Sequence, residues 1–346
     1  MKRHWKAVLG IAISALLIWW ALRDVDLADV WHEVRGANLW LLAAAVAVAT
    51  AGFFLRALRW EVLLRPIRRG THLGHRFAAV NIGFAANNVL PARVGEFARA
   101  WAFSRMEPVS ISGAVGSLVA ERFLDAVAIL ALLVVAVLHP SFPAEATVVG
   151  RPIGETLTAL LIVVAVAVAG LVLLLSFPAT FLRLARGLSG FLPGQVGRTA
   201  VEVLESFLGG LDALRRPGLV LPAVAWSLVI WSWSALSFWL GFLAFGIDRG
   251  FAAALFVQAI VAVGVSVPAA PGYFGTWHAA ALVGLHEVYG VGEASTLAFA
   301  FGYHLGGFFP VTLLGLWYAG RLGMSFSELG KAGATVEEAL DRELGS

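Results

Sequence analysis

Long uninterrupted apolar stretches limit what this chain can fold into more than any other feature of its sequence. A helix rises ~1.5 Å per residue, so roughly 20 apolar residues cross the ~30 Å hydrocarbon core of a bilayer. Only 14% of the residues are charged, whereas ordinary soluble domains have about 25%. A water-soluble fold is therefore excluded. We predict an all-α polytopic membrane protein with six full transmembrane helices at 5–22, 39–58, 113–138, 156–177, 219–245 and 295–319.

Basic residues near the ends of these stretches set the expected orientation, because Lys and Arg gather on the cytoplasmic side of a membrane. Segments 59–76 and 177–218 are rich in arginine and are expected in the cytoplasm. Segment 23–38 is acidic and 139–155 has Arg151 as its single Lys or Arg, so both are expected outside. We therefore expect a multi-pass protein of the cell membrane whose N-terminus and C-terminus are both cytoplasmic.

Two further apolar segments, 76–106 and 251–288, fit this orientation if each enters and leaves the membrane on the same side. Helix-breaking residues interrupt the first at 90–95 and the second at 267–272. Irregular backbone at membrane depth is tolerated where protein or a wet cavity surrounds it. We interpret both segments as re-entrant helical hairpins, the first entering from the cytoplasm and the second from outside. The alternative is two ordinary pairs of short helices that cross fully.

The order span, hairpin, span then occurs twice, at about 39–138 and 219–319, in opposite orientations. Transporters often use such inverted repeats, and their broken helices meet near the midplane at the substrate site. We predict a single transmembrane domain over 1–322 and a short soluble cytoplasmic tail at 323–346. An amphipathic pattern at 201–211 further predicts a helix in the cytoplasmic interface.

Three charged residues early in the predicted span 113–138 are the first site candidates, because a charge inside a bilayer costs at least ~2.5 kcal/mol. Glu121 and Asp125 share one helix face, and Arg122 reaches Asp125 at the i, i+3 spacing. Two interpretations stay open: a self-neutralising cluster that locks helices together, and a binding site.

The first hairpin carries a candidate anion site. Pro91 ends the incoming helix, Gly95 allows close backbone approach, and the outgoing helix begins near Glu96 with free amide groups and the positive end of its dipole. Arg93 adds a planar fork of donors that suits phosphate. The alternative is that Glu96 pairs internally with Arg93 or Arg99.

The second hairpin again places a helix N-terminus inward, after Gly272 and Tyr273. His278 and His304 are the titratable candidates in this half, and each is either a hydrogen-bonded packing residue or a proton relay. The sequence has no cysteine, no metal-ligand spacing and no phosphate-binding P-loop. We therefore expect no metal, no cofactor and no ATP hydrolysis, and we identify no catalytic residue.

These motifs give the chain a family resemblance. It is carried by the string NVLPARVGE at 88–96 with Arg99, by Glu121-Arg122 and Asp125, and by Pro268, Pro271-Gly272 and Gly275. Over about 5–321 the sequence resembles the lysylphosphatidylglycerol synthase transmembrane, or flippase-like, family. The resemblance implies a membrane domain that moves aminoacylated or glycosylated lipids between leaflets, in some relatives fused to a soluble aminoacyl transferase that this sequence lacks. Where the family has a glutamate after the second Pro-Gly motif, this chain has Trp277 and His278.

We therefore predict a membrane transporter or flippase for a phosphate-bearing lipid or lipid-linked carrier, such as a phospholipid, a glycolipid or a polyprenyl phosphate. One alternative is a membrane-embedded glycosyltransferase or lipid-modifying transferase component, and another is a scaffold for a separate transferase partner. Nucleic acid is not an expected partner. The substrate-binding candidates are Asn88, Arg93, Glu96, Arg99, Glu121, Arg122, Asp125, Gly272, Tyr273, His278 and His304.

Overall fold

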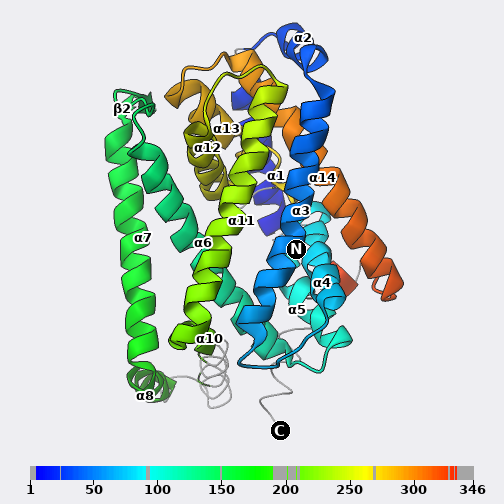
Figure 1. The fold of residues 1–346 in the computed structure, drawn as a ribbon, viewed down its shortest axis with the longest axis vertical. Helices are drawn as coiled ribbons and strands as arrows, with labels where there is room; N and C mark the ends of the chain where they lie inside the picture. The colour runs from blue at the N-terminus through cyan, green and yellow to red at the C-terminus, as the bar shows by residue number, and fades with distance from the viewer. Residues whose placement is uncertain are drawn as a thin grey trace.

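The computed structural model describes residues 5–23, 25–90, 94–148, 150–189, 201, 208, 211–267, 270–325, 328–330 and 332. Over these residues the chain is a bundle of α-helices with one pair of two-residue strands (Figure 1). The helices are α1 (Trp5–Leu22), α2 (Leu27–Gly36), α3 (Leu39–Leu64), α4 (Leu73–Val89), α5 (Gly95–Met106), α6 (Ile111–Val137), α7 (Ile153–Ser176), α8 (Pro178–Ser189), α10 (Asp212–Arg215), α11 (Pro217–Ala244), α12 (Phe251–Gly264), α13 (Thr276–Ala281) and α14 (Glu293–Arg321). The shorter elements are η2 (Pro271–Tyr273), η3 (Leu282–Val288), β1 (Thr147–Val148) and β2 (Arg151–Pro152).

Every apolar stretch that the sequence predicts as a span is helical, with ends close to those expected except in α3, which continues past the expected end at 58 to Leu64. Capping side chains explain two of the starts. Asn38 accepts hydrogen bonds from the N–H groups of Trp40 and Leu41 at the start of α3, and Ser110 accepts one from Gly113 at the start of α6. Among the described residues, three helices are long and apolar enough to cross a membrane, namely α3, α11 and α14. The count of six full spans stays a prediction.

Helix α2 lies in the acidic segment 23–38, for which the sequence predicted an external position and no helix. Asp26 caps it by accepting a hydrogen bond from the N–H of Ala28, and Val30 is buried. The segment therefore folds because one cap and one apolar contact compensate for its low hydrophobicity.

The two interrupted segments occupy opposite ends of the molecule. In Figure 1, α4 and α5 lie in the lower half, toward α8, whereas α12 and α13 lie in the upper half, toward α2. With 17, 12 and 14 residues, α4, α5 and α12 extend only ~26, ~18 and ~21 Å. Each is shorter than the ~30 Å core of a typical bilayer.

Glycines bring the helices of the first segment and its neighbours unusually close. A Cβ on Gly95 would lie 2.1 Å from the carbonyl oxygen of Gly83, so α5 starts directly against α4. A Cβ on Gly315 would lie 2.2 Å from the carbonyl oxygen of Asn81, so α14 crosses α4 at a similarly small distance. Only glycine fits at such backbone contacts.

Some predicted features fall outside the described residues. They include Arg93 at the tip of the first interrupted segment, Pro268 and Ala269 in the second, most of the predicted interfacial helix at 201–211, and most of the tail after 325.

Candidate functional site

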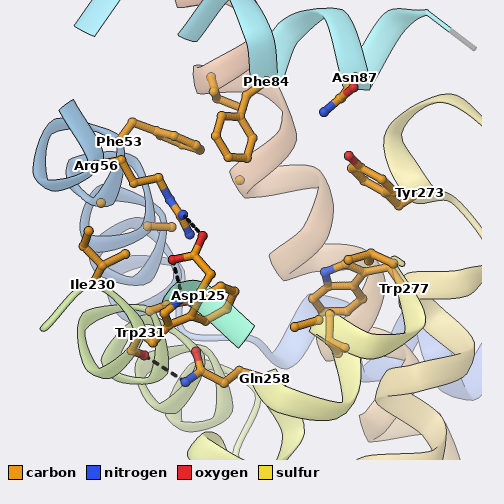
Figure 2. Close-up of a pocket in the computed structure, with 18 of the residues that line it drawn as sticks. Phe53, Arg56, Phe84, Asn87, Asp125, Ile230, Trp231, Gln258, Tyr273 and Trp277 are labelled. Atoms are coloured by element: carbon orange, nitrogen blue, oxygen red, sulfur yellow. Dashed lines mark hydrogen bonds and ion pairs between the residues drawn. The ribbon is translucent and has the colours of Figure 1, made fainter. Parts of the chain in front are cut away.

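A cavity of about 740 Å³ lies between the two halves of the helix bundle. Residues of α3, α4, α5 and α6 line one part of it, and residues of α11, α12, α13, α14 and η2 line the other. Figure 2 shows the two sides facing each other, with Arg56 and Asp125 on one and Tyr273 and Trp277 on the other. The cavity is therefore built from both predicted repeats.

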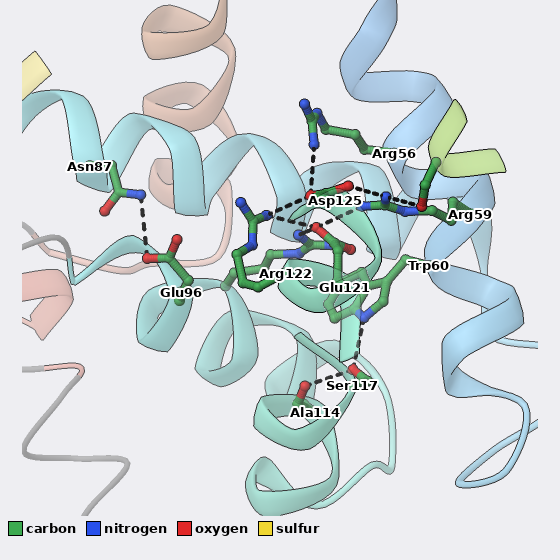
Figure 3. A network of polar contacts seen from close by, with 12 residues as sticks. Arg56, Arg59, Trp60, Asn87, Glu96, Ala114, Ser117, Glu121, Arg122 and Asp125 are labelled. Atoms are coloured by element: carbon green, nitrogen blue, oxygen red, sulfur yellow. Dashed lines mark hydrogen bonds and ion pairs between the residues drawn. The ribbon is translucent and has the colours of Figure 1, made fainter. Parts of the chain in front are cut away.

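The polar part of the cavity adjoins a network of four arginines and two carboxylates, of which all but Arg122 are largely buried (Figure 3). Here "the arginine network" means Arg56 and Arg59 of α3, Arg99 of α5, and Glu121, Arg122 and Asp125 of α6. The four guanidinium groups carry +4 and the two carboxylates −2, so the network has a formal surplus of +2.

Glu121 lies at the centre of this network and is fully buried. Arg99 donates to both of its carboxylate oxygens, at 2.8 and 3.0 Å, in a bidentate pair. Arg122 donates at 2.9 Å, and a nitrogen of Arg59 lies 3.2 Å away. The Arg99 guanidinium also lies 4.0 Å from the ring centroid of Trp60. Three cations therefore share one carboxylate, which ties α3 and α5 to α6.

Asp125 forms the second centre and links α6 to α3 and α11. It accepts hydrogen bonds from Arg59 and, at 3.0 Å, from the indole N–H of Trp231. Arg59 also donates to the hydroxyl of Ser227 at 2.8 Å. Two further guanidinium groups come near the Asp125 oxygen Oδ2 but beyond hydrogen-bond distance, Arg56 at 3.6 Å and Arg122 at 3.8 Å.

The start of α5 is fixed by its contacts with α4. Asn87 accepts a hydrogen bond from the Gly95 N–H at 2.8 Å, and its amide nitrogen lies 3.5 Å from a carboxylate oxygen of Glu96. Asn88 donates to Thr312 of α14 at 2.8 Å. Of the two alternative partners considered for Glu96, Arg99 instead makes its bidentate pair with Glu121, and Arg93 lies outside the described residues.

The candidates of the second half lie on the opposite side of the cavity. Gly272 and Tyr273 both have positive φ, at 71° and 61°, and Tyr273 lines the cavity. His304 also lines it, and its ring stacks on Trp277 with centroids 5.0 Å apart. A positive φ is uncommon for a residue with a side chain, so the surrounding fold holds Tyr273 in place.

His278 is fully buried and packs among aromatic rings, 4.1 Å from the centroid of Phe301 and 5.2 Å from that of His304. Neither of its ring nitrogens has a hydrogen-bond partner among the described residues. The expected hydrogen-bonded packing role is therefore corrected to packing by ring contacts.

The structure thus brings Asn88, Glu96, Arg99, Arg122, Asp125, Tyr273 and His304 to the lining of one cavity. Glu121, Gly272 and His278 lie outside this lining, and Arg93 lies outside the described residues. Among the groups of three or more His, Asp or Glu side chains in the described part of the chain, none could hold a metal ion.

Sequence reasoning missed Arg56 and Arg59, which supply half of the guanidinium groups in the arginine network. Both occur where the apolar run of α3 becomes more polar, so the run was taken to end near Leu58, whereas the helix continues to Leu64. Two arginines at i, i+3 spacing beside an apolar run were the available signal, because such residues then share a helix face.

Comparisons with known proteins agree with these features. Residues 7–315 match the family model described as "Lysylphosphatidylglycerol synthase TM region". A stretch of 132 residues, or 38% of the chain, is 26% identical to the glycosyltransferase AglD of Haloferax volcanii. This stretch covers 21% of that protein, so the chain spans about a fifth of the length of the curated relative it matches.

Proposed function

Because the chain belongs to the lysylphosphatidylglycerol synthase TM region family, we propose that it is a flippase or transporter that moves a phosphate-bearing lipid, or lipid-linked carrier, between membrane leaflets. The membrane character of the family and the apolar helices α3, α11 and α14 make it a membrane protein. The identity of the transported lipid and its movement between leaflets are what we propose.

One observation carries the proposal: a cavity between the two helix groups that adjoins a surplus of positive charge. Buried charges are costly in a membrane and usually have a partner. The arginine network has two more cations than carboxylates among its members, and three of those cations, Arg56, Arg99 and Arg122, line the cavity. An anionic group on a lipid would supply the missing counter-charge.

The rest of the cavity suits the apolar part of a lipid. Its lining includes the rings of Trp231, Trp233, Phe238, Trp277, Tyr303 and Phe308. Pockets of ~300–1,000 Å³ with apolar walls and a few polar groups are typical of small-ligand sites. An amphiphile with an anionic head would meet cations at one end and hydrocarbon surfaces at the other.

The proposed architecture is a single domain over 1–322 with six spans, two re-entrant hairpins and both termini in the cytoplasm. The short α4–α5 and α12–α13 pairs, located at opposite ends in Figure 1, support the hairpins. We propose that these hairpins meet at the cavity, where Asn88, Glu96, Tyr273 and His304 contribute with the arginine network; the predicted site residue Arg93 lies outside the described residues.

Reconstitution into liposomes tests this function. Labelled lipids that differ in head group, from phospholipids to polyprenyl phosphate, would be placed in one leaflet and their exchange followed by quenching from outside. We expect exchange of phosphate-bearing lipids above that of protein-free vesicles, and loss of it in Arg122→Gln. Rates equal to those of empty vesicles for all lipids would contradict the proposal.

The relative named as a glycosyltransferase favours a second candidate, in which the chain is the membrane component of a lipid-linked glycan assembly step. This candidate predicts sugar transfer to a lipid phosphate by membranes that contain the chain. A transfer assay with radiolabelled nucleotide sugars separates the two: transfer by the purified chain favours the glycosyltransferase candidate, and leaflet exchange without transfer favours the flippase.

A further inference from the structure

We propose that Arg56 and Arg122 together bind the phosphate of a lipid monophosphate whose apolar chain is attached directly to that phosphate, and that the aromatic part of the same cavity holds the start of that chain. This inference rests on the proposed function and deepens it, because it names the head group, the two residues that bind it and the part of the lipid that the aromatic side chains contact.

Arg56 and Arg122 direct guanidinium nitrogens at one place. The Arg56 Nη1 atom is buried and has no hydrogen-bond partner among the described residues. The Arg122 side chain is 45% exposed and lines the cavity, and its Nη2 atom also donates to Glu121. Both approach the same Oδ2 atom of Asp125, at 3.6 and 3.8 Å. The two nitrogen atoms can therefore be no farther apart than the sum of these two distances. A phosphate can bridge a gap of that size with two charge-assisted hydrogen bonds of about 2.8 Å.

Aromatic rings hold Arg56 in this position, and among the described residues it donates no hydrogen bond to a carboxylate. Its guanidinium carbon lies 5.6 Å from the ring centroid of Phe84 and 5.3 Å from that of Trp231. Figure 2 shows the side chain extended beside Phe84 toward Asp125. Cation–π contacts of this kind orient the group and leave its N–H donors for a ligand.

The other two arginines have a different role. Arg99 makes a bidentate pair with Glu121, and Arg59 binds both Asp125 and Ser227. Their side chains are almost completely buried, with 4% and 0% exposed. They stabilise the network, whereas Arg56 and Arg122 provide its free binding capacity.

The charge of the network favours an anionic phosphate. A monoester carries about −1.5 to −2 near neutral pH, and the arginine network alone has a surplus of +2. Glu96 also lines the cavity, and counting it lowers the surplus to +1, which still favours an anionic head group over a neutral one. A head group with an additional positive charge would therefore bind the arginine network less tightly than a bare phosphate.

The aromatic side chains point to hydrocarbon next to that phosphate. The indole N–H of Trp231 donates to Asp125 at 3.0 Å, and the indole N–H of Trp233 donates to the Val48 carbonyl at 2.7 Å. The hydroxyl of Tyr303 lies 2.7 Å from the hydroxyl of Ser237. These polar atoms are already used within the protein, so the rings offer apolar surface. A sugar hydroxyl placed against these rings would lose hydrogen bonds to water, and the rings would not replace them. The lining also holds two buried polar atoms without a partner among the described residues, Gln258 Oε1 and His304 Nδ1.

Binding to the purified full chain in detergent tests the inference. The probes are geranylgeranyl phosphate, the uncharged alcohol of the same chain, a glucosyl phosphodiester of the same chain, and inorganic phosphate. We expect geranylgeranyl phosphate to bind most tightly, because it alone supplies both the monoester charge and the directly attached chain. Tighter binding of the glucosyl diester, or binding of inorganic phosphate as tight as that of the lipid, would overturn the ligand class.

Variants of Arg56 test the residue assignment. Arg56→Gln should weaken geranylgeranyl phosphate binding by roughly tenfold or more, and Arg56→Lys by less, because lysine keeps the charge and loses the fork. Affinity for the alcohol should stay within about twofold in both, since it has no charge to lose. Arg65→Gln is the matched control, because Arg65 ends the same helix but is 47% exposed in a weak surface pair. Melting temperatures measured alongside exclude misfolding.

Failure of this inference and failure of the proposed function have different signatures. Leaflet exchange that is unchanged in Arg56→Gln would refute the role of Arg56 and leave the flippase function standing. Tight, Arg56-dependent binding of geranylgeranyl phosphate without any leaflet exchange would confirm the binding site and refute transport.

Discussion

Arg99 and Glu121 form a bidentate ion pair with N–O distances of 2.8 and 3.0 Å, and at most 4% of either side chain is exposed. The pair joins the short helix α5 to the long helix α6. Because Glu121 also forms ion pairs with Arg59 and Arg122, loss of its charge would leave three cations without their shared partner.

We therefore expect Glu121→Gln to lower the free energy of unfolding by about 3–5 kcal/mol, the usual effect of removing one partner of a buried pair. The double variant Arg99→Gln with Glu121→Gln should recover part of this loss, because one uncompensated cation is removed. Thermal melting in detergent measures both, and Glu155→Gln, which changes an exposed carboxylate of α7, is the control. If Glu121→Gln melts like the wild type, the pair does not stabilise the fold.

A second prediction concerns two glycines of α14 that differ in their surroundings. A Cβ at Gly315 would lie 2.2 Å from the Asn81 carbonyl oxygen and 2.4 Å from the Ala85 Cβ, whereas at Gly320 it would meet nothing within 4 Å. Gly315→Ala should cost about 1–3 kcal/mol or more by forcing α14 away from α4. Gly320→Ala should be neutral or stabilise by about 0.5–1 kcal/mol, because alanine favours the helix. Equal melting temperatures for the two variants would contradict the close α4–α14 contact.

The helices and their breaks follow from the sequence because they depend on local properties. Apolar runs and the Pro-Gly clusters determine where α1, α4, α5 and α12 begin and end, and the apolar segment expected at 251–288 has the same bounds as the stretch from α12 to η3. Its re-entrant course stays a prediction. Helix α2 was missed because its short amphipathic pattern is weak without the contact that buries Val30.

The site is only partly predictable because it depends on which helix faces meet. Glu121 and Asp125 were found from their charge inside an apolar run. Nothing in the sequence shows that Arg59 of α3 contacts Asp125 across the bundle, or that Trp231 of α11 donates to the same carboxylate. Those contacts join residues 66 and 106 positions apart and become visible only in the folded chain.

A third prediction concerns the orientation of the chain. Asp26, which caps α2, and Thr147 of β1 belong to elements at one end of the molecule in Figure 1. Arg186 belongs to α8 at the other end. The chain has no cysteine, so a single introduced cysteine is the unique thiol. Cysteines that replace Arg68 or Arg186 should react with a membrane-impermeant maleimide only after the membrane has been made permeable. Cysteines that replace Asp26 or Thr147 should already react in intact cells. Labelling of Arg186→Cys in intact cells would reverse the proposed topology.

A fourth prediction concerns Glu107, which joins the start of α4 to the end of α5. Burial would raise the pKa of this carboxyl, but the His72 N–H at 2.9 Å, the His75 ring at 2.8 Å and Arg68 at 3.7 Å together hold the pKa below its usual 4.5. A depressed folded-state pKa stabilises the fold above the unfolded-state pKa, and this contribution is lost as pH falls through the folded-state pKa.

The melting temperature of the wild type should therefore exceed that of Glu107→Gln near pH 6, and the difference should shrink as pH falls below about 4.5. Glu145→Gln, at an exposed position between α6 and β1, is the control and should show no such trend. A wild-type advantage that grows toward low pH has the wrong sign for a depressed pKa and would refute the assignment.

The last prediction separates binding from stability at Asp125. This carboxylate accepts hydrogen bonds from Arg59 and Trp231, so Asp125→Asn should lower the melting temperature. The same carboxylate also lies 3.6 Å from Arg56 and 3.8 Å from Arg122, where it competes with a lipid phosphate for both cations. Its neutralisation raises the surplus of the arginine network by one positive charge.

Asp125→Asn should therefore bind geranylgeranyl phosphate more tightly, by roughly 5- to 10-fold, although it is less stable. Leaflet exchange should slow, because release of the lipid then becomes limiting. The control is Asp248→Asn, which changes an exposed carboxylate between α11 and α12 and should affect neither property. A purely structural Asp125 predicts that affinity and stability fall together. That result would mean that the phosphate does not compete with Asp125, and it would move the proposed phosphate position away from the gap between Arg56 and Arg122.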